Sequence, residues 1–131
     1  MINSFGGSVY DGLALYDAIR DCKSEIVTLG MGKIMSMATF VFLAGDKRYI
    51  SKRSTIMVHE ISDWIGGQMT DLKIQVKESE RLADILLDIY CDRTNEKKSY
   101  WKKLKRESYF SPEEAVRVGM AHGIIGDEEE K

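Results

Sequence analysis

The stretch "IVTLGMGKIMSMATFVFLA", residues 26–44, decides the fold. Its first part, residues 26–31, is a short apolar run typical of a buried strand, and residues 36–44 are an apolar run that favours a helix. Residues 32–35 lie between the two runs and predict a turn. The lone hydroxyl of Ser36 lies at this strand-to-helix junction, flanked by methionines. Ser36 is therefore either a small helix-capping residue or a nucleophile.

Strands and helices alternate along the rest of the chain. Apolar spacing and turn residues predict helices at residues 9–22, 36–44, 70–94, 97–106 and 111–119, and strands at residues 26–31, 47–51, 55–59 and 124–125. Ser8 and Ser111 stand where helix N-caps are expected, and Pro112 occupies a first helical position. This alternation predicts an α/β domain with largely parallel strand pairing.

Composition narrows the class of protein. The chain has 131 residues, 44% hydrophobic and 31% charged, which suits a single globular domain. The formal net charge of −2 argues against nucleic acid or an anionic membrane as the main partner, and we interpret the basic residues 97–106 as a solvated helix face. Cys22 and Cys91 lack metal-ligand spacing and are interpreted as reduced thiols, with one disulfide as the alternative. With no spanning apolar stretch and no secretory leader visible, we expect a cytoplasmic protein.

Few residues can carry chemistry. Serine catalysis needs a hydroxyl, an imidazole that accepts its proton, and backbone N–H groups that stabilise the oxyanion. Ser36 at a helix start supplies the hydroxyl, and His59 at the end of a predicted strand supplies an imidazole. The Gly6-Gly7 turn allows a backbone to approach a ligand closely. His122, between Ala121 and Gly123, is interpreted as a turn residue.

Four motifs in order carry a resemblance that these residues alone do not establish. They are "INSFGGSVYDGLALYDAI" (2–19), "GMGKIMSMATF" (30–40), "IMVHE" (56–60) and "RESYFSPEEAVRVG" (106–119), and "GGQMTD" (66–71) lies between the last two. Together they resemble the family of Clp protease proteolytic subunits (ClpP) over nearly the whole chain.

The resemblance implies a role for each matching residue. Ser36 matches the nucleophile and His59 the general base, and Glu107 falls where the family has its triad aspartate. Gly7 and Met37 match the two oxyanion-hole donors. Gly6, Ile61 and Trp64 are assigned to substrate binding, with residues 61–67 pairing with an extended polypeptide.

The resemblance also implies an architecture and partners. We expect the crotonase-like α/β fold of this family in one domain, residues 1–131, with a head of residues 1–60 and 97–126, a protruding handle of about residues 61–96 and an acidic tail of residues 127–131. The expected protein is a homo-oligomer, either one heptameric ring or two stacked rings, that works with an AAA+ unfoldase on unfolded polypeptides. The unfoldase consumes ATP, whereas the peptidase needs no cofactor and no metal. The family also has a segment before its Ile-Asn-Ser strand that this chain is expected to lack.

Several departures from the family pattern leave alternatives open. Glu107 replaces an aspartate, Phe5 replaces a proline, and Lys105 stands where an acid usually precedes Arg106. These departures favour, as the alternative to a Clp-type serine endopeptidase, a catalytically weak or inactive structural subunit of the same kind. A crotonase-fold acyl-CoA enzyme is a more distant alternative, since it needs an oxyanion hole but no triad.

Overall fold

The computed structural model describes residues 1–62 and 64–126, so the predicted tail at residues 127–131 lies outside the described residues. In chain order its elements are β1 (Ile2–Ser4), α1 (Val9–Arg20), β2 (Val27–Met35), α2 (Met37–Leu43), β3 (Lys47–Ser51), β4 (Thr55–Val58), α3 (Met69–Arg93), α4 (Lys98–Lys102), β5 (Ser108–Phe110), α5 (Pro112–Arg117) and β6 (Gly123–Ile125). The predicted alternation of strands and helices is confirmed.

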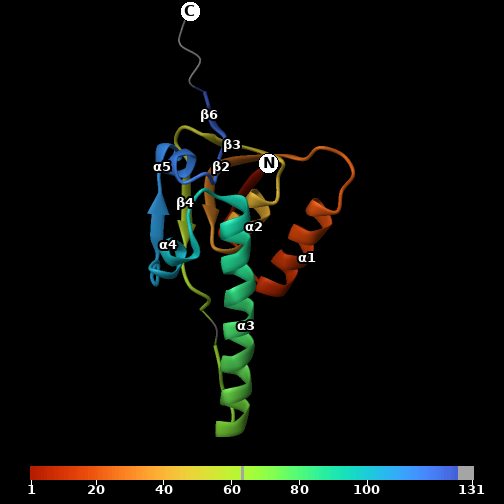
Figure 1. The fold of residues 1–131 in the computed structure, drawn as a ribbon, viewed down its shortest axis with the longest axis vertical. Helices are drawn as coiled ribbons and strands as arrows, with labels where there is room; N and C mark the ends of the chain where they lie inside the picture. The colour runs from red at the N-terminus through yellow and green to blue at the C-terminus, as the bar shows by residue number, and fades with distance from the viewer. Residues whose placement is uncertain (63, 127–131) are drawn as a thin grey trace, which may run out of the picture.

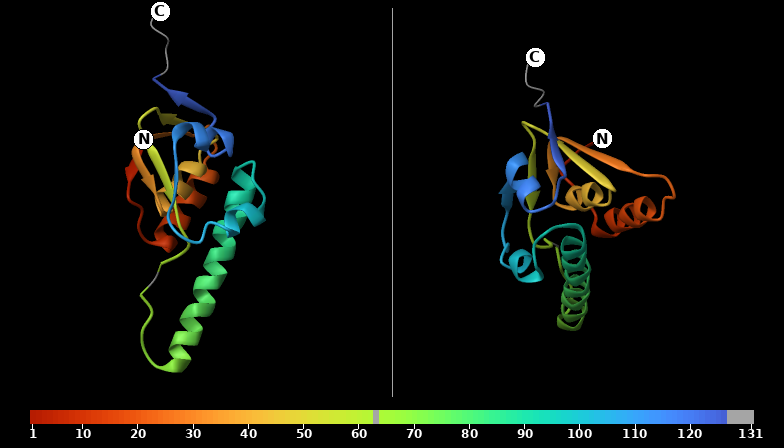
Figure 2. Two further views of the ribbon diagram at one scale, coloured as in Figure 1. Left: turned by 90° about the vertical axis from the view of Figure 1, so that its left-hand side faces the viewer. Right: turned by 45° about the horizontal axis from the view of Figure 1, so that its top comes forward.

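The sheet is built around β2. Its strand order is β5-β4-β2-β3-β6, and β1 also pairs with β2. β2 pairs with β3 through residues 27–30 and with β4 through residues 33–35, so successive parts of one strand have different neighbours and the sheet curls (Figures 1 and 2). Pairing is parallel except between β4 and β5, which confirms the predicted α/β class.

The predicted turn at residues 32–35 is wrong, because β2 continues to Met35. Gly32 takes a positive φ of 82° inside the strand. The pairing with β1 shifts register there, from Ile2 opposite Gly30 to Ser4 opposite Ile34. A glycine within a strand often marks such a bulge, so this glycine bends the strand without ending it. The longer strand carries the chain directly into Ser36.

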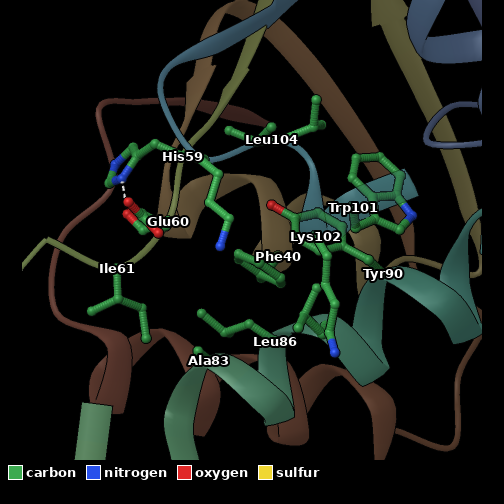
Figure 3. Close-up of a pocket in the computed structure, with 13 residues that line it drawn as sticks. Phe40, His59, Glu60, Ile61, Ala83, Leu86, Tyr90, Trp101, Lys102 and Leu104 are labelled. Carbon is green, nitrogen blue, oxygen red and sulfur yellow. Dashed lines mark hydrogen bonds between the residues drawn. The ribbon is translucent and has the colours of Figure 1, made fainter. Parts of the chain in front are cut away.

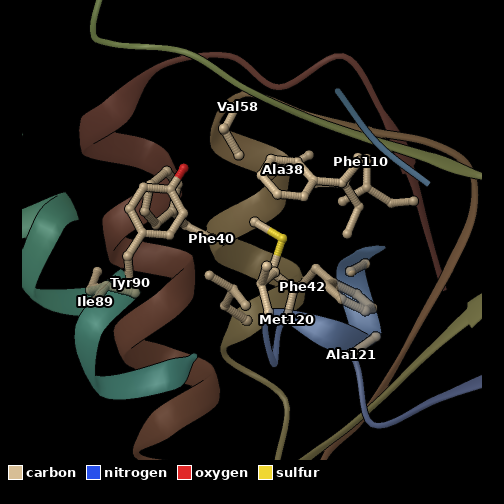
Figure 4. Close-up of a cluster of buried hydrophobic side chains, with 14 of the residues drawn as sticks. Ala38, Phe40, Phe42, Val58, Ile89, Tyr90, Phe110, Met120 and Ala121 are labelled. Carbon is tan, nitrogen blue, oxygen red and sulfur yellow. The ribbon is translucent and has the colours of Figure 1, made fainter. Parts of the chain in front are cut away.

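The core is centred on α2 (Figure 4). All but one of the seven residues of α2 are buried, and Phe42 and Leu43 have no exposed surface. A helix that is apolar on all sides must be surrounded, and α1, β1, β2, β4 and α3 all contact it. Burying one such large side chain contributes about 2 kcal/mol of transfer free energy, which fixes α2 and the junction that precedes it.

Only the C-terminal half of α3 belongs to this core. Its buried residues are Leu82, Leu86, Ile89 and Tyr90, whereas its N-terminal half projects away from the sheet (Figures 1 and 2). The segment before α3 is tied to the projecting half by two hydrogen bonds between the Gln75 side chain and the Gly66 backbone, of 3.1 and 2.9 Å. Among the described residues, no helix is long and apolar enough to cross a membrane.

The basic stretch after α3 forms a shorter helix than predicted. α4 spans Lys98–Lys102 only, and not the whole of residues 97–106. Trp101 stacks on Tyr90 with ring centroids 4.3 Å apart and donates a hydrogen bond to Thr94 Oγ1 at 3.2 Å. These contacts attach α4 to the end of α3.

Candidate active site

Parallel pairing between β2 and β4 brings Ser36 and His59 into one pocket. Met35 is the register partner of Met57, so the two strands end at the same edge of the sheet. Ser36 and His59 follow directly and both line a pocket of about 270 Å³, which we call the Ser36 pocket. Its lining residues are Phe5, Gly7, Val9, Ser36, Met37, Phe40, Met57, His59, Ile61, Ser62, Leu86 and Tyr90.

Ser36 occupies a strained turn. Its φ of 53° and ψ of −125° make it the one non-glycine residue with positive φ in the described ranges. Its N–H donates to Met57 O at 2.8 Å, and the buried Thr39 hydroxyl lies 3.3 Å from the same oxygen. Ser36 stands at the N-cap position of α2, but its side chain makes no capping hydrogen bond. This backbone conformation resembles the sharp strand-to-helix turn that presents a nucleophilic serine, and a capping role for the hydroxyl finds no support.

The first glycine turn packs directly on the Ser36 turn. A Cβ on Gly6, which has a φ of 97°, would lie 2.7 Å from Met35 O and 2.9 Å from both Met37 N and Ser36 Cβ. Only glycine allows so close an approach. Gly7 follows with open space around its Cα, and in the described part of the chain its N–H has no hydrogen-bond partner. The N–H of Met37, the first residue of α2, likewise has no intrahelical acceptor.

His59 lacks the predicted carboxylate partner. Its ring Nδ1 contacts the backbone oxygen of the next residue, Glu60. Glu107 is exposed, and its carboxylate accepts a hydrogen bond of 2.9 Å from the Tyr109 hydroxyl, which raises the pKa of Tyr109. Glu107 does not line the Ser36 pocket. A carbonyl oxygen only accepts, so a hydrogen bond in this contact requires the proton on Nδ1, and in that neutral tautomer Nε2 is the acceptor.

The residues predicted to bind substrate lie in different settings. Ile61 is half-buried and lines the Ser36 pocket, whereas Trp64 is fully exposed. Within the predicted pairing segment, residues 61, 62 and 64–67 form no paired strand, and residue 63 lies outside the described residues. Phe5, where the family has proline, lines the pocket with its ring 4.5 Å from the Lys33 ammonium.

Two positioning residues were missed by the sequence analysis. A Cβ on Gly12 would lie 2.1 Å from Met37 Cγ, so this glycine lets α1 pack against the residue after Ser36. A glycine within a predicted helix was the available signal. Arg48 is buried, has no carboxylate partner among the described residues and donates to four backbone oxygens, of Gly45, Arg93, Gly119 and Met120. Nothing in the sequence distinguished it from an exposed strand arginine.

Three arginines converge on the C-terminal end of α2. Arg93 donates to Leu43 O at 2.9 Å and Gly45 O at 2.7 Å, and Arg20 donates to Ala44 O at 2.9 Å. Arg48 donates to Gly45 O as well, at 3.2 Å. Burial, followed by the charges of Arg93 and Arg20, lowers the pKa of Arg48 to about 10. Cations are favourable at a helix C-terminus, so this cluster stabilises the helix that begins after Ser36.

Comparison with known proteins identifies the family of the chain. Residues 1–128 match the family described as Clp protease. The chain is 39% identical over 127 residues to the ATP-dependent Clp protease proteolytic subunit of Deinococcus radiodurans, an alignment that covers 95% of this chain and 62% of that relative. The chain thus spans less than two thirds of the length of the curated relative it matches. On this match the chain belongs to the Clp protease family.

Proposed function

We propose that the chain is a serine-type endopeptidase subunit of the Clp protease, which cleaves unfolded polypeptides through an acyl-enzyme. The observation that carries this proposal is the meeting of Ser36, His59, Gly7 and Met37 in one pocket. The relative from Deinococcus radiodurans is named as an ATP-dependent proteolytic subunit, which supports the same activity here. The AAA+ unfoldase partner and the cytoplasmic location belong to this proposal too.

The proposed reaction follows serine-protease logic. His59 Nε2 accepts the Ser36 proton as the hydroxyl attacks a peptide carbonyl, and the N–H groups of Gly7 and Met37 stabilise the oxyanion. His59 then returns the proton to the leaving amine, and a water molecule, activated in the same way, hydrolyses the ester. These proton transfers require an imidazole that is protonated at Nδ1, and the contact of Nδ1 with the Glu60 backbone oxygen favours that tautomer. For Glu107 to serve as the triad carboxylate, one of its oxygens has to reach His59 Nδ1 in place of the Glu60 backbone oxygen.

One observation favours the alternative of a catalytically weak or inactive structural subunit. The contact of His59 Nδ1 with a backbone oxygen orients the imidazole but stabilises the imidazolium less than a carboxylate does. Glu107 does not line the Ser36 pocket, and its carboxylate accepts a hydrogen bond from Tyr109. A structural subunit would retain the contacts between subunits of the oligomeric ring, and its Ser36 would not react with serine-directed reagents.

Assembly into rings is part of the proposal. We propose that the projecting half of α3 and the segment before it form the handle through which rings stack. Three exposed apolar side chains on this half support the idea, because such groups are usually buried against a partner: Met69, Ile74 and Val76.

Kinetics of matched serine variants test the activity. We expect Ser36→Ala to lower kcat/KM for an unstructured fluorogenic peptide by at least about a thousandfold, because the nucleophile is lost. The control Ser24→Ala changes an exposed serine outside the Ser36 pocket and is expected to keep full activity. Cleavage by Ser36→Ala at the unmodified rate would reject the assignment.

A further inference from the structure

A second hollow adjoins the Ser36 pocket. This hollow, which we call the Trp101 groove, has a volume of about 320 Å³ and lies between α3, α4 and the end of β4 (Figure 3). The two spaces share Phe40, His59, Ile61, Leu86 and Tyr90. Figure 3 shows Trp101 and Tyr90 toward one end of the groove and His59 and Ile61 toward the other. The Trp101 groove is therefore a direct neighbour of the Ser36 pocket.

The groove combines an apolar floor with positive charge. Lys102 and Lys105 line it, and among the described lining residues the carboxylate beside them is that of Glu60. In the described part of the chain neither lysine forms an ion pair, whereas Lys98, at the start of α4, is paired with Asp88 at 3.4 Å. The chain as a whole has a formal net charge of −2, so this local excess of positive charge runs against the overall balance.

The two lysines stand on a fixed support. Trp101 is 3% exposed, stacks on Tyr90 and contacts Tyr100 edge to face at 5.0 Å. Its backbone oxygen accepts a hydrogen bond of 3.1 Å from the N–H of Leu104. Lys102 directly follows Trp101 and Lys105 directly follows Leu104, so these contacts hold the backbone beside both lysines.

We propose that Lys102 and Lys105 form a subsite for an acidic substrate side chain. The subsite would select polypeptides that carry Asp or Glu within a few residues of a large apolar side chain near the cleaved bond. The apolar side chain packs on the floor of the groove and the carboxylate lies between the two ammonium groups. This inference rests on the proposed peptidase function and specifies its substrate class.

Peptides that differ at one position test the subsite. Three fluorescein-labelled peptides share a central Leu-Phe pair and carry Glu, Gln or Lys two residues before it. A second set carries the same residues two positions after it. Binding to the Ser36→Ala chain is measured by fluorescence anisotropy, and kcat/KM is measured on the unmodified chain. In at least one set, we expect the Glu peptide to bind about fivefold more tightly than the Gln peptide, and the Lys peptide most weakly. This order should weaken as salt rises.

Two double variants of equal charge separate the groove from the general surface. Lys102→Glu with Lys105→Glu should invert the order, so that the Lys peptide binds most tightly. Lys97→Glu with Lys103→Glu alters exposed lysines that do not line the groove and should keep the original order. Near-UV circular dichroism of the Trp101–Tyr90 stack checks the fold. If the first variant misfolds, Lys102→Gln with Lys105→Gln replaces it, and the preference for Glu should disappear.

The outcomes distinguish this inference from the proposed function. If the Ser36→Ala chain binds the Glu peptide more tightly than the Lys peptide but the unmodified chain cleaves neither, the subsite is supported and the peptidase function is rejected. If the unmodified chain cleaves the Glu and Lys peptides and the two do not differ in binding or in kcat/KM, the peptidase function is supported and the subsite is rejected. No peptide binding, or the original order in the Lys102 and Lys105 variant, overturns the inference.

Discussion

At the scale of single residues, Gly6 and Gly7 have different physical roles although they are adjacent. The backbone of Gly6 lies against the Ser36 turn at a positive φ, and Gly7 faces the open pocket. We expect Gly6→Ala to lower the free energy of unfolding by about 2 kcal/mol, because its methyl group meets Met35 O and Met37 N.

Gly7→Ala is the matched control for stability, since a Cβ there meets nothing within 4 Å. We expect its stability to stay within about 0.5 kcal/mol of the unmodified chain. Urea unfolding measures both values. Equal stability of the two variants would contradict the close packing of Gly6 on the Ser36 turn.

His122 is a turn residue with a measurable pH signature. Its Nδ1 accepts a hydrogen bond of 3.0 Å from the N–H of Arg48, and its own N–H donates to Arg48 O at 2.8 Å. Burial, followed by the charges of Arg48 and Arg93, lowers the pKa of His122 below its ordinary 6.5. The folded chain therefore binds this proton less readily than the unfolded chain, and its stability falls as the pH drops below about 6.5.

We expect His122→Asn to reduce this pH dependence, because the amide oxygen accepts the Arg48 N–H without titrating. Urea unfolding of both chains at pH 7.5 and pH 5.5 measures the effect. The same loss of stability in both chains over this interval would show that His122 does not titrate in the way described.

At the scale of elements, α2 is held at both ends. Its start is fixed by the Ser36 and Gly6 turns, and its end by Arg20, Arg48 and Arg93. Arg48→Met is expected to lower the free energy of unfolding by about 3 kcal/mol, since it leaves several buried carbonyls without donors. The control Arg53→Met alters an exposed arginine and should change stability by less than about 0.5 kcal/mol. A small effect at Arg48 would mean that water replaces its hydrogen bonds.

Elements with a strong local pattern were predicted well. α1 begins after Ser8, whose hydroxyl accepts from Asp11 N at 3.3 Å, and the Ser111–Glu114 capping box starts α5. The predicted helix at residues 70–94 is α3 (Met69–Arg93). Such signals lie within a few residues of each other, so the sequence alone carries them.

Features that depend on distant partners were missed. β5 was not predicted, because three residues pair with β4 through contacts such as Ser108 opposite Val58. β2 extends past Gly32 because β1 and β4 pair with it there. The sequence also suggested Ser36, His59 and Glu107 as site residues. It did not predict that the Glu107 carboxylate accepts a hydrogen bond from Tyr109 and lies outside the Ser36 pocket.

At the scale of the whole molecule, the projecting half of α3 is the feature that the single chain leaves unexplained. We expect Ile74→Asp to reduce the native mass by separating stacked rings, because Ile74 is 64% exposed on the half proposed as the handle. Native mass spectrometry counts the copies from the chain mass of 14.9 kDa. Lys23→Asp, an exposed change outside α3, serves as the control. The same native mass for Ile74→Asp and the unmodified chain would reject this role for α3.

Reaction with a fluorophosphonate, followed by mass spectrometry of the peptides, tests the central claim most directly. Proton transfer from Ser36 to His59 beside two oxyanion donors makes one hydroxyl far more nucleophilic than the others. The account predicts one adduct per chain, located on Ser36, which forms much more slowly in the His59→Ala variant. No adduct on an assembled chain, or an adduct on another serine, would contradict it.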